Sequence, residues 1–317
     1  MSDEHANDQA ARDVAALRDA VVEAMDRIIA RTEPAPERPA RSILTGFAGL
    51  DEALGGWLPG GQLVVLAGRP AMGTTALGLG LCEHLTCEQG RAALFVDLVT
   101  KRSTVAHRLL GMRADINWSK FELKKELSQV ELAKLGRSYN ELHKAPLFVA
   151  DPPVATVAEI DRLAQWAYHL REPDLIVIDD LDAIEPAARR QSGRERAARA
   201  YRGLKELAGL LSVPIVLLSR LRWEEPGRNR PDLRDLRQRE TTCREADVIL
   251  MLHRPDYYDP ADQPGVAELI IAQNNLGPTG VVRLDYDKHV VRFADQKPDP
   301  DFDPASGPDF DPDAIPF

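Results

Sequence analysis

Five short apolar runs divide the first three quarters of the chain, and segments with apolar residues every three or four positions separate them. The runs cover residues 62–67, 92–97, 147–150, 174–179 and 214–219. The helical patterns between them cover residues 73–87, 102–112, 128–143, 156–171 and 194–211. Strands that are apolar along their whole length and alternate with helices are typical of a parallel sheet covered on both faces. The pattern therefore predicts an α/β fold of this kind.

The pattern changes after Asp247, and the flanks of the chain differ from its body. Strands expected near 247–253, 267–274, 280–285 and 289–293 follow one another through short turns, which predicts antiparallel strands added at the C-terminal side. Residues 1–41 combine an amphipathic helix with a proline-rich linker, and the body covers residues 42–293. Residues 294–317 are rich in proline and aspartate and are predicted to be disordered.

Composition and charge exclude several classes of protein. The chain of 317 residues has a net charge of −10, of which residues 295–317 carry −6 through seven aspartates and one lysine. The body is only mildly acidic, so any contact with nucleic acid must come from local basic patches. No apolar run approaches the ~18 residues of a membrane span, and the acidic N-terminus is unlike a secretory signal. The three cysteines show no metal-ligand spacing, and we expect a cytoplasmic protein.

A glycine-bounded loop follows the first apolar run and precedes the first helical pattern. Residues 68–75 read GRPAMGTT, whereas a working phosphate-binding loop reads G-x-x-x-x-G-K-[ST]. Thr74 occupies the lysine position, and the hydroxyl that binds Mg²⁺ is kept at Thr75. The run 174–179 ends in Asp179, which can hold Mg²⁺ beside such a loop. Weak binding of ATP and Mg²⁺ is therefore predicted, with Thr75 and Asp179 on the metal side. The predicted nucleotide-binding residues are Gly68, Arg69, Gly73, Thr74, Thr75 and Asp179.

Several longer segments resemble the motor domain of DnaB-type replicative helicases. They are TGFAGLDEALGGWLPGGQLVVLAGRPAMG, RPDLRDLR, EADVILMLHRPDYYD and ELIIAQNNLGPTG, in the family's order within residues 42–293. The resemblance implies a RecA-like P-loop NTPase fold, a hexameric ancestor, ATP bound between subunits and single-stranded DNA in a central channel. It also implies that the helix at residues 10–31 corresponds to the family's linker helix, which packs on the adjacent subunit.

The chain departs from this family at the positions that carry its chemistry. The phosphate-gripping lysine is Thr74, and the glutamate that positions the attacking water is Val99. The glutamine that senses the γ-phosphate is Arg220. The basic finger that reaches the neighbouring subunit is replaced within Gln273–Asn275. An arginine finger alone supplies about 10³–10⁵ in rate.

Asp97 or Arg220 could compensate a single loss, but the joint losses favour a protein that is not an active enzyme. We expect a degenerate nucleotide-binding, DNA-binding or regulatory module of DNA replication or repair. It would form homo-oligomers or co-assemble with a helicase. One alternative is an active ATP-dependent 5'-3' DNA helicase or translocase with rearranged catalytic residues. Another is a protein-interaction scaffold that uses neither ATP nor DNA.

Arginines are frequent after the fourth and fifth apolar runs, where loops of the resembled fold line the DNA channel. Arginine there would bind phosphates without regard to sequence, although nearby carboxylates could instead pair with it on a solvated surface. The arginines predicted to contact DNA are Arg190, Arg194, Arg222, Arg228 and Arg230.

The last seven residues resemble the C-terminal tail of bacterial single-stranded-DNA-binding proteins, which is acidic and ends in Ile-Pro-Phe. In such a tail the terminal phenylalanine fills an apolar pocket while the aspartates approach a basic rim. A solubilising tail is the alternative. The predicted contacts to proteins that recognise such tails are Asp311, Asp313, Ile315, Pro316 and Phe317.

Overall fold

The computed structural model describes the residues that form the body of the chain. These are residues 41–117, 119–122, 126–153, 155–184, 193–222, 228–275 and 277–296. The expected N-terminal helix and C-terminal tail lie outside them.

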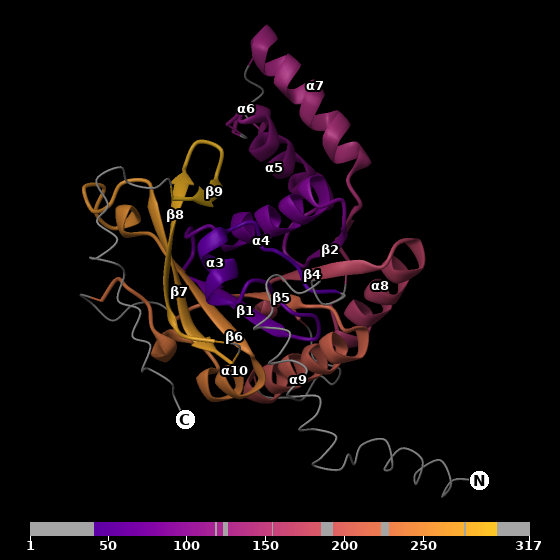
Figure 1. The fold of residues 1–317 in the computed structure, drawn as a ribbon, viewed down its shortest axis with the longest axis vertical. Coiled ribbons are helices and arrows are strands. Elements are labelled where there is room, and N and C mark those ends of the chain that lie inside the picture. Colours follow the sequence, from indigo (N-terminus) through magenta and orange to yellow (C-terminus); the bar gives the residue numbers. More distant parts are fainter. Residues whose placement is uncertain are drawn as a thin grey trace, which may run out of the picture. The chain divides into compact units, whose positions relative to one another are not determined.

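A nine-stranded sheet forms the centre of the body, in the order β3-β2-β4-β5-β1-β6-β7-β8-β9 (Figure 1). The strands from β3 to β6 in this order are parallel, and β7, β8 and β9 follow as antiparallel neighbours. This topology confirms the predicted fold class. The strands are β1 (Leu63–Gly68), β2 (Ala92–Asp97), β3 (Leu147–Ala150), β4 (Pro173–Asp179), β5 (Ile215–Arg220), β6 (Val248–His253), β7 (Val266–Asn274), β8 (Gly280–Asp287) and β9 (Arg292–Asp295).

Helices connect the strands and cover the sheet. The α-helices of the described residues are α3 (Ala48–Ala53), α4 (Thr74–Glu83), α5 (Arg102–Ala114), α6 (Ser119–Glu122), α7 (Gln129–Lys144), α8 (Val157–Leu170), α9 (Gly193–Leu211) and α10 (Arg239–Glu245). Short 3-10 turns cover Leu181–Ala183, Leu233–Asp235 and Pro255–Tyr257, and a π-helical turn, His84–Glu88, extends α4. Helices α4, α5, α7, α8 and α9 fall where the sequence pattern predicts them.

The strand residues alternate between two separate apolar clusters. On β1, Val64 and Leu66 face the cluster that contains α4 and α5, whereas Leu63 and Val65 face the cluster that contains α8 and α9. All six residues of β1 are buried, because side chains of a strand alternate and both faces are covered. Burying a leucine of this kind contributes about 1.5–3 kcal/mol. With both faces packed, the carboxyl ends of the central strands are the place where polar side chains can converge.

Helix α7 stands apart from the sheet and packs on α5 (Figure 1). It begins with a capping box, in which Ser128 accepts from the Glu131 amide and the Glu131 side chain accepts from the Ser128 amide. Arg113 at the end of α5 pairs with Glu141 of α7 and with Glu83, each at 2.6 Å. Lys134, near the start of α7, pairs with Asp115 at 3.0 Å, and Leu142, near its end, packs against the core. Ion pairs near both ends and an apolar contact therefore hold α7 to the body. Among the described residues, no helix has both the length and the apolar character needed to span a membrane.

Two local predictions differ from the structure. The last strand begins at Arg292 rather than near residue 289, because a turn occupies residues 288–291 and Val291 adopts a left-handed φ of 56°. The short helices α3 and α10 were not predicted. Each spans fewer than eight residues, which is too short for an apolar period to be recognised.

Candidate nucleotide-binding site

The glycine-bounded loop joins β1 to α4 at the carboxyl end of the sheet. Gly73 caps α4 with φ 101°, and a Cβ there would lie 2.9 Å from Phe293 Cζ. A Cβ on Gly68 would lie 2.5 Å from Thr74 Cγ2. Both glycines are therefore required by close packing. The loop leads into the first turn of α4, whose backbone N–H groups have no partner within the helix. A helix N-terminus of this kind is an arrangement that binds phosphate.

Thr75 and Asp179 meet as the sequence predicted, although 104 residues separate them. The Thr75 hydroxyl donates to Asp179 Oδ2 at 2.6 Å. Burial raises the pKa of Asp179 to about 6, the Thr75 hydrogen bond opposes the shift, and the charges of Asp97 and Asp180 add to it. A hydroxyl and a carboxylate in contact are oxygen donors of the kind that Mg²⁺ takes in nucleotide sites. The pair therefore fits the metal that a bound nucleotide would bring.

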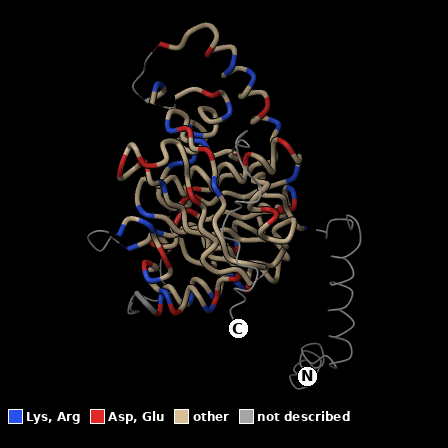
Figure 2. The backbone as a smooth tube through the Cα atoms, turned by 60° about the vertical axis from the view of Figure 1, so that its left-hand side comes forward, with Lys and Arg blue, Asp and Glu red and all other residues tan. Residues whose placement is uncertain are grey.

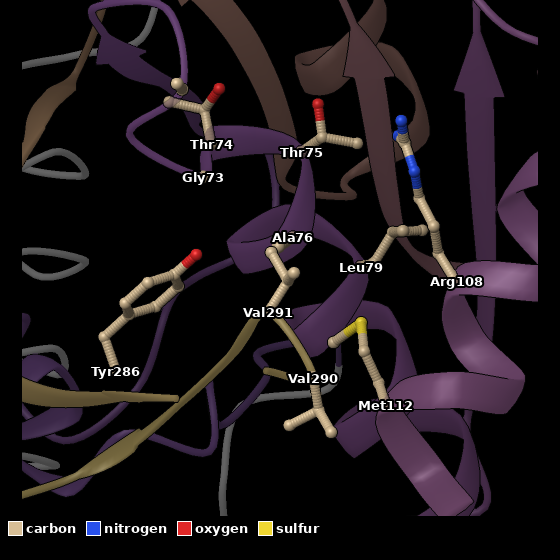
Figure 3. A pocket seen from close by; sticks show the side chains of 11 residues that line it. Gly73, Thr74, Thr75, Ala76, Leu79, Arg108, Met112, Tyr286, Val290 and Val291 are labelled. Carbon is tan, nitrogen blue, oxygen red and sulfur yellow. The ribbon is translucent and has the colours of Figure 1, made fainter. Parts of the chain in front are cut away.

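A cavity of about 250 Å³ opens beside this loop (Figure 3). Its walls are Ala71, Gly73, Thr74, Thr75, Ala76, Leu79, Arg108, Met112, Tyr286, Val290 and Val291. Figure 3 shows the Arg108 guanidinium at the height of the Thr75 hydroxyl, and Val290 and Met112 lower in the view. The cavity thus has a polar end at the loop and an apolar wall. Sequence reasoning missed Arg108 and Tyr286, because nothing in the local pattern of either segment indicates that it reaches the loop.

Two other arginines fix the loop from outside the cavity. Arg69 is buried, and its guanidinium donates to the carbonyls of Asn229 and Arg228 and lies 3.8 Å from Asp235. Arg254 stacks 3.8 Å from the centre of the Tyr286 ring and donates to the Ala71 carbonyl at 3.3 Å. Arg69 is thus directed to the 228–235 segment and does not line the cavity.

The structure also shows the surroundings of three positions at which the sequence predicts departures from the family. The methyl group of Thr74 packs over Gly68. Val99 is 53 % exposed and lies in the turn after β2. Asp97, which the sequence suggested as a substitute for a glutamate at position 99, accepts hydrogen bonds from the amides of Val99 and Thr100 at 2.9 and 2.6 Å and from the Thr100 hydroxyl at 2.6 Å. Its carboxylate therefore holds a turn and would have to leave it to act as a base.

Arg220 lies at the end of β5, opposite Gly68 in the sheet register. Its Nε contacts Asp180 Oδ2 at 2.7 Å, and its side chain is 51 % exposed whereas that of Asp180 is 5 % exposed. The structure therefore brings a cation to the edge between the loop and the end of β4.

Gln273 and Asn275 lie at the opposite edge of the sheet. Their strand β7 runs antiparallel to β6, so its end pairs with the beginning of β6, with Asn274 opposite Val248. The side-chain amide of Gln273 donates to the carbonyls of Cys243 and Ala246, each at 2.9 Å. The backbone N–H of Asn275 donates to the Asp247 carbonyl. Within one chain these residues are remote from the phosphate loop.

Of the arginines predicted to bind DNA, three have described side chains. Arg228 pairs with Asp232 and Asp235 at 2.6 and 2.5 Å, and Arg230 pairs with Glu268 at 2.6 Å. Arg222 is exposed and donates to the Arg237 carbonyl at 2.8 Å. Acidic and basic positions are interspersed along the described chain (Figure 2). The pairing reduces the charge that these arginines would present to a phosphate.

The remaining predicted contacts lie outside the described residues. Arg190 and the tail residues Asp311, Asp313, Ile315, Pro316 and Phe317 are among them, and the side chain of Arg194, in the first turn of α9, is also not described. The predictions for these residues stay predictions.

Comparison with solved structures defines the structural class of the body. One solved ATPase domain matches with a TM-score of 0.80 and 25% identity, covering 90% of this chain and all of the other. A DnaB-like replicative helicase, solved in a study of its interactions with primase, matches with a TM-score of 0.80 and 26% identity, covering 87% of this chain and 66% of that one. The body is thus a RecA-like ATPase domain fold.

The family then follows from the sequence. Residues 42–295 match the model of the DnaB-like helicase C terminal domain, and the chain belongs to this family. The replicative DNA helicase DnaB of Leifsonia xyli subsp. xyli is 30% identical over 294 residues, which is 92% of this chain and 63% of the helicase. The chain thus spans about six tenths of the length of that relative.

Proposed function

We propose that this chain is a nucleotide-binding member of the DnaB-like helicase family that lacks helicase-level ATP hydrolysis and acts as a binding or regulatory module in DNA replication or repair. The observation that carries the proposal is the contrast within one site. The loop and the Thr75–Asp179 pair are intact at 2.6 Å, whereas Thr74 and Val99 stand where the family has its lysine and glutamate. Binding groups persist where groups that act on the transition state are missing.

The geometry supports a definite placement of the nucleotide. The amides at the start of α4 would hold the phosphates, and Thr75 and Asp179 would hold the Mg²⁺ that a bound nucleotide brings. The base would enter the apolar part of the cavity, beside Met112 and Val290. Arg108 would supply a positive charge from α5, since its charge already acts on Asp179. Because Thr74 stands at the lysine position, this chain would bind nucleotide more weakly than a phosphate loop with lysine does.

ATP turnover of the purified full-length chain tests the proposal directly. Nucleotide binding without turnover, with and without single-stranded DNA, is the expected result. Turnover above about 0.1 per second, at the low end of common enzyme rates, would contradict it and support an active translocase. That alternative draws on Arg108 and Arg220, two cations that remain near the phosphate loop. Binding of neither nucleotide nor DNA would support the scaffold instead.

Self-association or co-assembly with an active helicase is part of the proposal. Helix α7 exposes Leu132 and Tyr139, which are 45 % and 56 % accessible and, seven residues apart, lie on one face of the helix. Neighbouring exposed apolar residues favour burial against a partner. Light scattering on the full chain should give a mass above one chain, and a Leu132→Ser, Tyr139→Ser double variant should lower it. Leu170→Ser on α8, which also removes an exposed apolar side chain, serves as the matched control.

Contact with single-stranded DNA is the second part. It would be sequence-independent and would weaken steeply between two salt concentrations. Arg222→Gln should reduce the salt dependence of the DNA affinity. Arg162→Gln should not, although Arg162 is also an exposed arginine, paired with Glu159 on α8.

The tail is the third part, and we propose that it binds proteins that recognise acidic tails ending in Ile-Pro-Phe. Deletion of residues 315–317 should abolish their capture from a replication and repair extract, and unchanged capture would contradict this role.

A further inference from the structure

A second cavity, of about 160 Å³, opens at the carboxyl end of the sheet. It lies on the face covered by α8 and α9, whereas the nucleotide cavity lies on the face covered by α4 and α5. Its wall comes from α9, from the turn that follows β4 and from α10, which packs beside α9 (Figure 1). A cavity of about 150 Å³ can hold a benzene ring. The second cavity therefore has room for one aromatic side chain.

The floor of the second cavity favours an apolar occupant. The Tyr201 hydroxyl is hydrogen-bonded to the side chains of Ser219 and Thr242. The Thr242 hydroxyl donates to the Gln238 carbonyl at 3.0 Å. These polar groups already satisfy one another, so an apolar group can enter without breaking a hydrogen bond. The rest of the floor is apolar and buried, and it consists of Leu181, Ile184, Ala197, Ala200 and Leu236.

The mouth of the second cavity is charged. Arg196 on α9 is exposed, and Arg237 is 46 % exposed and pairs with Asp182 at 2.7 Å. These three residues are the charged members of the wall, which gives the mouth a net positive charge. Arg222 donates to the Arg237 carbonyl at 2.8 Å and so lies next to the mouth. A ligand with an apolar centre and negative flanks would complement this arrangement.

The chain carries such a ligand in its own sequence. The sequence Asp-Phe-Asp-Pro occurs twice after the described residues, at positions 301–304 and 309–312. In each copy one phenylalanine stands between two aspartates. A segment that serves only to raise solubility gains nothing from these phenylalanines, whereas an aromatic ring with an anion on either side fits the floor and the mouth of the second cavity.

The length of chain that follows the sheet selects the second copy. Strands β9 and β5 are five strand spacings apart in the sheet, which is about 24 Å. From Gln296, the last described residue, an extended chain covers at most about 22 Å to Phe302 and about 50 Å to Phe310. Of the two copies, only the one around Phe310 can therefore reach the second cavity of the same chain.

We propose that residues 309–311 dock in the second cavity of their own chain, with the Phe310 ring on the apolar floor and the two aspartates at Arg196 and Arg237. The docked segment would also cover Arg222 and so compete with single-stranded DNA. This competition rests on the DNA contact proposed above, whereas the docking does not. Residues 315–317 stay free for the partner proteins that the tail is proposed to bind.

A fluorescent peptide of residues 305–314, added to the full-length chain, tests the docking. It should bind the Phe310→Ser chain about tenfold more tightly than the wild type, whose own segment competes at an effective concentration near millimolar. In the Phe310→Ser chain, Ala197→Leu should abolish binding because the larger side chain fills the cavity. Ala198→Leu should not, because Ala198 lies on the same helix but does not line the cavity.

The charges at the mouth are tested in the same Phe310→Ser chain. Arg196→Gln should weaken the peptide by about two- to fivefold, as expected for an exposed ion pair. Arg202→Gln is the control, since Arg202 is exposed on α9 but does not line the cavity. Asp182→Asn should strengthen the peptide by a similar factor, because it releases Arg237 from its ion pair. A peptide that itself carries Phe310→Ser should not bind.

Three results would overturn the docking. They are equal peptide affinities of the wild-type and Phe310→Ser chains, unchanged binding to an Ala197→Leu chain that thermal melting shows to be folded, and Arg196→Gln and Asp182→Asn effects of the same sign. An apparent peptide affinity of the wild type that rises on dilution of the protein would assign the segment to a second copy and overturn docking within one chain.

The competition with DNA has its own readout. Phe310→Ser should raise the affinity of the full-length chain for single-stranded DNA. An unchanged DNA affinity, with the peptide results as expected, would overturn the competition and leave the docking in place.

Discussion

The two edges of the central sheet use their polar side chains differently. At the carboxyl edge, Asp179 is buried with a raised pKa, and Arg220 and Arg108 offer charge toward the loop. At the other edge, Gln273 and Asn274 donate to backbone carbonyls, and charged groups form ion pairs such as Lys205–Asp247 and Arg91–Asp174.

This difference shows where binding capacity has been kept. The carboxyl edge holds charged groups that are only partly solvated, and a bound ligand can form hydrogen bonds or ion pairs with them. At the opposite edge, the Gln273 side chain and the Asn275 backbone N–H donate to backbone carbonyls of the fold. We propose that such a subunit can receive a nucleotide but cannot complete the site of a neighbour, which suits a regulatory subunit in a mixed assembly.

The largest expected effect comes from disrupting the loop that builds the charged edge. Gly73→Ala places a Cβ 2.9 Å from Phe293 Cζ at a φ of 101°, and it should cost about 2–4 kcal/mol of unfolding free energy and abolish nucleotide binding. Gly80→Ala on α4 meets nothing within 4 Å and should stabilise by about 0.5–1 kcal/mol. Chemical denaturation measures the unfolding free energy of both variants. Equal changes would contradict a special role for Gly73.

Restoring the family's lysine should sharpen the contrast between binding and turnover. Thr74→Lys adds a cation that can bind the phosphates, and it should raise the affinity for ATP by about ten- to a hundredfold. Turnover should not follow, because Val99 and the Gln273–Asn275 edge are unchanged. Calorimetry and a phosphate-release assay measure the two quantities. Thr74→Met, of similar length but uncharged, should leave affinity near that of the wild type.

The buried acid at the carboxyl edge should make stability depend on pH. The pKa of Asp179 is about 6 in the folded protein, whereas that of a solvated aspartate is 3.8. Ionisation of Asp179 therefore disfavours the folded state, and stability falls as pH rises from about 4 to 6. Asp179→Asn should therefore stabilise the apo protein by about 1–3 kcal/mol at pH 7.5 and have little effect near pH 4. Thermal melts at both pH values measure this, with Asp161→Asn, at a partly exposed position of α8, as control. A destabilised Asp179→Asn protein at pH 7.5 would contradict the shift.

The smallest effect is expected at the opposite edge of the sheet, where Gln273 lies. Gln273→Ala leaves the carbonyls of Cys243 and Ala246 without their donor and should cost about 1–2 kcal/mol. Nucleotide affinity should not change, since the loop lies at the other edge. Gln165→Ala on α8, which loses only a surface bond to Asp161, is the control. A change in affinity for Gln273→Ala alone would mean that the two edges are coupled.

Much of the fold could be predicted from the sequence, because continuous apolar runs such as 62–67 can be buried only between two covered faces. The meeting of Thr75 with Asp179 was also predictable, since a glycine-bounded loop and an aspartate that ends a strand lie together when the strands are parallel. The cavity wall was not, because Arg108 and Tyr286 reach it only through the packing of α5 and the β8–β9 turn.

The sequence by itself determined the strands, the phosphate loop and the absence of lysine at position 74, because these depend on local residue types and spacing. Only the tertiary structure decided which charges serve that loop. It turned Arg69 toward Asp235 and placed Arg220 against Asp180. The physical reason is that an ion pair forms only between side chains that lie close together in space. Residues far apart in the chain become neighbours only when the sheet assembles.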